Sequence, residues 1–143
     1  MAKLKTRVDC RYRGVLKNQY GFFLSEARRA QYRGFMSKVI VDSNKFYRPD
    51  LSIIEGLVRM EGFGPKDGDR KPVGAVIASA DPVTADAVGA SLIGIRPSSI
   101  GYLKFAEKKR VGTLRDSQII GGFTQRTQNV LPRTLSVSFP YSI

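Results

Sequence analysis

The sequence of 143 residues has the length of one domain, and its 42% hydrophobic and 25% charged residues exclude a disordered or fibrous chain. It contains no histidine and a single cysteine, Cys10, which excludes an internal disulfide, a Ser-His-Asp triad, a Cys-His pair, an imidazole zinc site and a four-thiolate iron–sulfur cluster. The 24 Lys and Arg outnumber the 12 Asp and Glu, and the net charge of +12 attracts polyanions such as RNA, DNA, anionic lipid or an acidic partner protein.

Targeting and membrane signals are lacking in the sequence pattern. The first residues are charged and form no apolar signal region, and the longest apolar run, residues 73–80, is too short to cross a bilayer. We therefore expect a cytoplasmic protein without a membrane span.

The first third of the chain predicts one strand and two helical segments. Residues 4–12 alternate in character as a half-buried strand does. Residues 14–33 predict a short helix and a loop. From Gly34, apolar residues recur at helical spacing, and this helix should end before Arg48 because the residue preceding Pro49 is disfavoured in the α region.

The remainder predicts two buried strands, two helices and a short third strand. Residues 50–58 and 73–80 are the two strands, and the glycine- and proline-rich residues 60–72 between them predict a long loop. Asp81 followed by Pro82 indicates a helix N-terminus, and Gly94 the end of that helix. A second helix is predicted over residues 97–112 and a strand over residues 118–120.

These elements predict a single α/β domain in which helices pack on a mixed sheet. Within residues 1–143 we distinguish a basic N-terminal segment, 1–33, a core, 34–120, and a C-terminal tail, 121–143, which the pattern leaves unassigned. The domain is expected to be partial, with its sheet completed by oligomerisation.

Acidic residues and glycines near the predicted strand ends form the candidate ligand site. Ligands of open α/β sheets gather beyond the carboxyl ends of strands, and two or three carboxylates there suit a divalent cation such as Mg²⁺. The simpler readings are a salt bridge for Glu55 and a helix cap for Asp81. The glycine stretch lacks the Lys-Ser/Thr and helix of a P-loop, which favours a structural or partner-binding loop. The candidates are Glu55, Glu61, Gly62, Gly64, Asp81 and Asp86.

The basic N-terminal segment supports an alternative function, nucleic-acid binding. It contains nine basic and two acidic residues, with Tyr12, Tyr20 and Phe22 interleaved. The simpler reading is a solubilising surface or a face for an acidic partner. The nine residues are Lys3, Lys5, Arg7, Arg11, Arg13, Lys17, Arg28, Arg29 and Arg33.

Three segments together resemble a known family. They are DLSIIEG at 50–56, MEGFGP at 60–65 and ASADPVTADAV at 78–88, and in order and spacing they are similar to the family called domain of unknown function 362. The resemblance extends loosely over residues 17–112 and is closest to the C-terminal half of that domain. One departure is Glu55, where the family commonly has aspartate, which puts any metal geometry there in doubt.

The resemblance implies an α/β fold and a redox setting, because many members are fused to ferredoxin-type iron–sulfur modules. It implies a ligand- or partner-binding component of such a system, with no cofactor held by this chain alone, and it implies no reaction. A half-domain leaves a sheet edge that must be covered. We therefore expect a homo-oligomer, or a partner that supplies the missing half.

Overall fold

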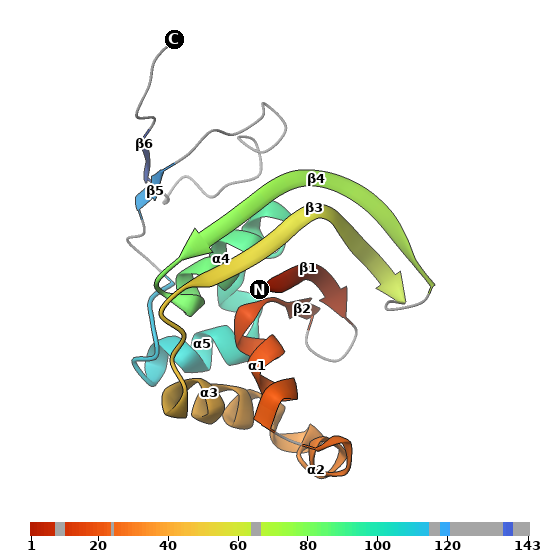
Figure 1. The fold of residues 1–143 in the computed structure, drawn as a ribbon, viewed down its shortest axis with the longest axis vertical. Helices are drawn as coiled ribbons and strands as arrows, with labels where there is room; N and C mark the ends of the chain where they lie inside the picture. Colours follow the sequence, from red (N-terminus) through yellow and green to blue (C-terminus); the bar gives the residue numbers. More distant parts are fainter. Residues whose placement is uncertain (8–10, 24, 64–66, 115–117, 121–135, 139–143) are drawn as a thin grey trace.

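A four-stranded mixed sheet with helices packed on one face forms the body of the protein (Figure 1). This computed structural model describes residues 1–7, 11–23, 25–63, 67–114, 118–120 and 136–138. The strands of the sheet lie in the order β2-β1-β3-β4. They are β1 Ala2–Arg7, β2 Arg11–Arg13, β3 Ser52–Phe63 and β4 Asp67–Ser79. The α/β fold class is confirmed.

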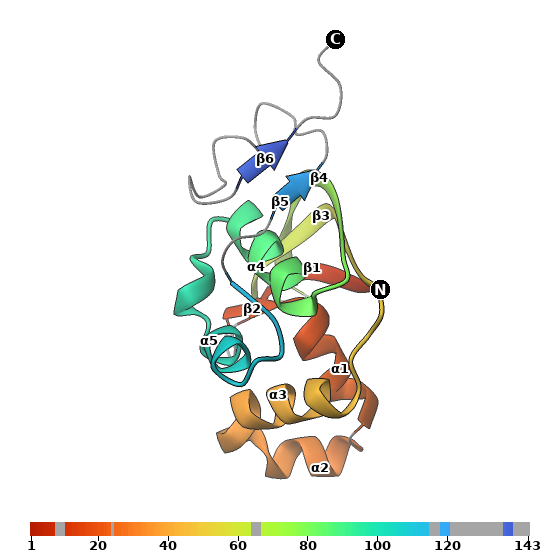
Figure 2. The ribbon, with the colours of Figure 1, turned by 90° about the vertical axis from the view of Figure 1, so that its left-hand side faces the viewer.

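The helices come from two stretches of the chain, one before β3 and one after β4 (Figure 2). Between β2 and β3 come α1 Val15–Phe23, α2 Glu26–Gln31, the 3-10 helix η1 Arg33–Phe35 and α3 Met36–Phe46. After β4 come α4 Pro82–Leu92, the 3-10 helix η2 Pro97–Ser99 and α5 Gly101–Lys108. Beyond them, strands β5 Gln118–Ile120 and β6 Ser136–Ser138 pair in parallel as a separate small sheet.

The N-terminal strand prediction was half right. Of residues 4–12, residues 4–7 belong to β1 and residues 11 and 12 to β2, and these two strands pair antiparallel with Thr6 opposite Tyr12. Residues 8–10 lie outside the described part. The alternation of side chains continues through both strands, so the pattern could not reveal the reversal between them. Residues 26–31, predicted as loop, form helix α2, whose first turn is capped by Ser25.

The prediction of a long loop over residues 60–72 was wrong, because most of these residues form strands. Strands β3 and β4 pair antiparallel from Ser52–Ser79 out to Phe63–Asp67. Glycine and proline suggested a loop, yet Pro72 is tolerated because β4 is an edge strand. The register shifts between Gly56 and Val58, where Leu57 of β3 faces two residues of β4, Val73 and Gly74, as in a β-bulge. Gly74 in this bulge adopts φ +71°, a conformation that favours glycine.

The other helix predictions fared better. Helix α3 ends at Phe46, before Arg48, as predicted. Helix α4 begins at Pro82 behind the Asp81 cap, and Gly94 follows its end with φ +78°, also as predicted. The helix predicted over residues 97–112 is split into η2 and α5, because Ile100 between them is extended. The predicted strand at residues 118–120 is confirmed as β5.

The core lies between the sheet and helices α1, α3, α4 and α5. Leu4 and Ile54 point from the sheet into this core, where they join Leu16, Ile40 and Leu103 from the helices, and all five are fully buried. The opposite face of the sheet carries exposed apolar side chains, including Val76 at 63% exposure. The sheet is thus covered on one side only by the described residues.

Candidate functional site

The predicted acidic site is not assembled in one place. The two strands that carry or precede its candidates, β3 and β4, do lie side by side. However, they are antiparallel, with Ser52 opposite Ser79 at one end and Glu61 opposite Asp69 near the other. Asp81 follows the first end, so its backbone is separated from that of Glu61 by about 30 Å of extended strand. Glu61 and Gly62 lie in the outer part of the hairpin, and Gly64 lies outside the described residues.

Asp81 is a structural cap with both carboxylate oxygens in use. Its Oδ1 accepts hydrogen bonds from the backbone N–H groups of Val83 (2.7 Å) and Thr84 (3.2 Å) at the start of α4. Its Oδ2 accepts from the N–H of Thr113 (2.9 Å), which ties the segment after α5 to the same helix end. A side chain at Gly112 would overlap the Asp81 carboxylate. The helix-cap reading of Asp81 is therefore confirmed.

Asp86 lies inside the protein and caps a different helix. Fully buried on α4, it accepts hydrogen bonds from the N–H groups of Val15 (2.6 Å) and Leu16 (3.1 Å) at the start of α1. Burial raises the pKa of Asp86 to about 7, although these two hydrogen bonds act in the opposite direction. Burial, together with the nearby Asp86, also raises the pKa of Tyr12 well above its ordinary value. Asp86 thus joins α4 to α1 and faces no solvent.

Glycines at two positions make room for this buried group. A Cβ at Gly14 would overlap the Asp86 carboxylate, and a Cβ at Gly89 would overlap the hydroxyl of Tyr12. The chain therefore packs β2, α1 and α4 closely around the Asp86 carboxylate, and this packing explains why small residues stand at both positions.

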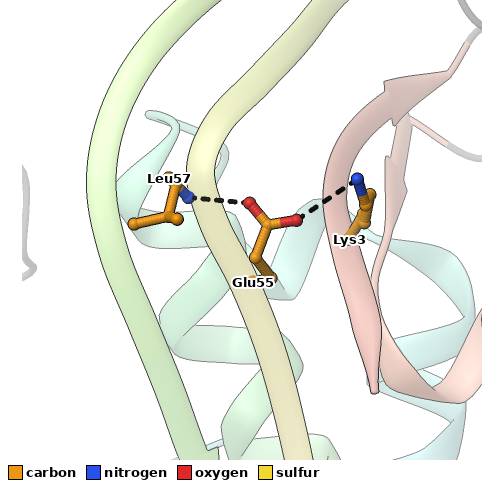
Figure 3. Close-up of polar contacts among 3 residues, drawn as sticks. All are labelled: Lys3, Glu55 and Leu57. Atoms are coloured by element: carbon orange, nitrogen blue, oxygen red, sulfur yellow. Dashed lines mark hydrogen bonds and ion pairs between the residues drawn. The ribbon is translucent and has the colours of Figure 1, made fainter.

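Glu55 forms a salt bridge, which is the simpler of the two roles considered for it. Its carboxylate lies 3.5 Å from Nζ of Lys3 on the neighbouring strand β1 and accepts a hydrogen bond of 3.2 Å from the N–H of Leu57 (Figure 3). Leu57 is the β3 residue that faces the bulge of β4, so Glu55 satisfies a backbone donor there. The side chain of Lys3 is 67% exposed, and such pairs contribute little to stability.

The four candidate carboxylates are thus distributed over the strand centre, the hairpin, a helix cap and the core. Across the described ranges, no three His, Cys, Asp or Glu residues come close enough to hold a metal ion together. The divalent-cation hypothesis required two or three of these carboxylates at one site, and it stays a prediction.

The basic residues of the N-terminal segment do not share one face. Lys3 and Lys5 lie on β1, whereas Arg28 and Arg33 lie on α2 and η1, at the far end of the helices (Figure 1). Lys17 is only 9% exposed, and its Nζ lies 4.1 Å from the centre of the Tyr20 ring, so it belongs to the interior. Arg11 and Arg13 are on β2, and the side chains of Arg7 and Arg29 lie outside the described part.

Sequence reasoning missed a second basic surface, on α3. Lys38, Lys45 and Phe46 on α3, and Phe35 directly before it, lie on one side of this helix at helical spacing, and all four are exposed. We call these four residues the α3 surface, and the exposed Asp42 lies on the same side of the helix. Nζ of Lys38 lies 5.8 Å from the centre of the Phe35 ring. The helical periodicity of charged and aromatic residues outside the apolar stripe was the signal that could have revealed it.

Other exposed cations surround the α3 surface, since η1 and α5 adjoin α3 and α2 adjoins η1. Against them, the exposed acidic side chains described on these helices and the segment after α3 are Asp42 and Asp50. The cations include Arg28, Arg33, Arg48, Lys104 and Lys108. The helical end of the molecule is therefore strongly cationic and carries exposed aromatic rings.

Comparison with known proteins decides the family. The family described as Domain of unknown function (DUF362) matches residues 1–91, which run from β1 into α4. The chain belongs to this family. The resemblance seen in the three sequence segments is thereby confirmed.

One curated relative of this DUF362 protein is the thylakoid-associated protein sll1697 of Synechocystis sp. (strain PCC 6803), which is 35% identical over 75 residues. The match covers 52% of this chain and 23% of the relative, so the matched segment corresponds to less than a quarter of that protein. No solved structure matches the chain. Within the described residues, each helix is too short or too polar to span a membrane.

Proposed function

We propose that this chain is a binding component that docks on an anionic membrane surface through the α3 surface. The observation that carries this proposal is the exposure of phenylalanines beside lysines on one side of α3. Phe35 is 60% exposed and Phe46 is 87% exposed, although aromatic side chains of this size are usually buried.

Charge and aromatic groups play different parts in such docking. Lysines and arginines near an anionic bilayer each contribute about 1 kcal/mol of attraction. Phenylalanine rings add apolar area that enters the boundary between headgroups and acyl chains. The α3 surface has both, and Lys38 and Lys45 between its two rings can reach lipid phosphates while the rings insert.

The name of the Synechocystis relative supports this choice among polyanions, since that protein is called thylakoid-associated. Nucleic acid remains the alternative from a different class. It requires the same positive charge, but the nine basic residues that motivated it are spread over β1, β2, α1 and the distal helices. The cytoplasmic location stays a prediction, and it agrees with docking on the cytoplasmic side of a membrane.

The redox partner implied by the family resemblance belongs to the same proposal. With one cysteine in these 143 residues, a ferredoxin-type cluster would have to be held by residues outside them. Docking at a membrane would bring this component to a place where such a partner can be held. Purification of the native complex, with its visible absorbance compared before and after reduction, tests whether a cluster is present.

Cosedimentation with vesicles tests the docking. We expect binding to vesicles that contain phosphatidylglycerol, weaker binding as salt rises, and little binding to pure phosphatidylcholine. The double variant Lys38→Glu/Lys45→Glu should weaken binding by at least about 2 kcal/mol. Phe35→Ser/Phe46→Ser should weaken it as well, with the salt dependence unchanged.

The matched control is Arg11→Glu/Arg96→Glu, which changes the net charge equally at exposed positions outside the α3 surface. Equal losses in both charge variants would indicate general electrostatic attraction and contradict a specific surface. Binding of RNA or DNA in a gel-shift assay without any vesicle binding would favour the nucleic-acid alternative.

A further inference from the structure

Strand β4 forms one edge of the sheet, and within the described residues no further strand pairs with its outer side. Edge strands are usually protected by a charge, a proline or a bulge. Here the protecting features come in the first part of β4, at Pro72 and at the bulge formed by Val73 and Gly74. From Ala75 to Ala80 the chain has neither proline nor charge. Among the described residues, nothing pairs with this part of the edge.

We propose that β4 of one chain pairs antiparallel with β4 of a second copy, about a twofold axis. An antiparallel edge is complementary to itself, because a twofold rotation brings the same donors and acceptors opposite each other. Two molecules that each carry a charge of +12 repel over most of their surfaces. The uncharged stretch from Ala75 to Ala80 is where they can approach, whereas an acidic partner would be drawn to the cationic helical end.

The side chains of β4 are consistent with this arrangement. Val76 and Ala78 are exposed, on the face of the sheet that the helices leave uncovered, and Ala75 and Ile77 are half-buried on the other face. A twofold axis perpendicular to the sheet preserves its faces, so exposed positions meet exposed positions. Val76 would then lie beside Val76 or Ala78 of the second copy, and both copies would bury apolar area at this interface.

The same geometry has a consequence for membrane docking, which rests on the proposed function. Because the axis is perpendicular to the sheet, both sets of helices lie on the same side of the joined sheet. The two α3 surfaces would lie on that same side, where both could contact one membrane. Two linked sites bind more tightly than one, since the second contact is made at high effective concentration.

Sedimentation equilibrium in the absence of lipid tests the pairing itself. We expect the wild type to dimerise within a concentration range that extends to about 0.2 mM. Val76→Lys should raise the dissociation constant of the dimer by about tenfold or more, because two lysines would lie at the interface. The matched control is Val58→Lys, which adds the same charge at a similarly exposed valine on the interior strand β3. It should dimerise as the wild type does.

A monomeric wild type throughout this range would overturn the proposal, and so would a dimer unaffected by Val76→Lys. Far-ultraviolet circular dichroism of each variant verifies that the fold is retained. A dimer that fails to bind vesicles would refute the membrane proposal and leave the pairing intact, whereas a monomer that binds vesicles would do the reverse.

Discussion

Replacing Asp86 by asparagine should remove a large pH dependence of stability. Burial raises the pKa of Asp86 from an ordinary value of 3.8 to about 7 in the folded protein. The folded state therefore binds the proton more tightly than the unfolded state does. The resulting stabilisation is fully present below about pH 4 and is lost as the pH rises through 7.

The size of the effect follows from the two pKa values. One unit corresponds to about 1.4 kcal/mol, so the rise from 3.8 to about 7 amounts to about 4 kcal/mol between pH 4 and pH 8. The asparagine side chain has the same shape as that of Asp86, keeps an oxygen for the N–H of Val15, and does not titrate. Tyr12, whose pKa is raised well above 10, stays neutral throughout this range.

Urea unfolding of wild type and Asp86→Asn at a series of pH values measures the difference directly. The difference between the unfolding free energies of the two proteins cancels the titration of other carboxylates and the repulsion within a cationic chain. We expect the free energy of unfolding of the wild type, relative to the variant, to fall by about 4 kcal/mol from pH 4 to pH 8. A constant difference, or a rise with pH, would show that the hydrogen bonds from Val15 and Leu16 outweigh the cost of burial, and would refute the reasoning.

Three further sets of substitutions test the structure around the same sheet and helices. Gly14→Ala and Gly89→Ala should each destabilise the protein by several kcal/mol, because a Cβ there overlaps Asp86 or Tyr12, whereas Gly34→Ala, with open space around it, should have little effect in the same urea assay. Asp81→Ala should cost about 1–2 kcal/mol by removing the α4 cap and the link to Thr113, and Asp50→Ala, at an exposed position, serves as its control. Glu55→Gln should change thermal stability by less than about 1 kcal/mol, because its partner Lys3 is largely exposed; a larger loss would indicate a further role for this carboxylate.

Elements with local signals could be predicted from the residues alone. The Asp81-Pro82 helix start, the αL glycine at Gly94 and the end of α3 before Arg48 were all predictable, because capping oxygens and proline act within a few residues. The family could also be recognised from three short segments. The outer part of the β3–β4 hairpin was missed, because pairing with an opposite strand overrode the local tendency of glycine and proline to form loops.

Which side chains meet depends on contacts between distant parts of the chain. The antiparallel direction of β3 and β4 separated Glu61 from Asp81, and no local pattern fixes the direction in which two strands pair. The partners of Asp86 lie 70 and 71 residues away, so burial turned an ordinary helix position into a cap for another helix. Exposure on α3, likewise, depends on which side of that helix α1 and α5 cover. Long-range packing therefore determines which side chains are exposed, whereas short-range sterics and hydrogen bonding determine where the helices begin and end.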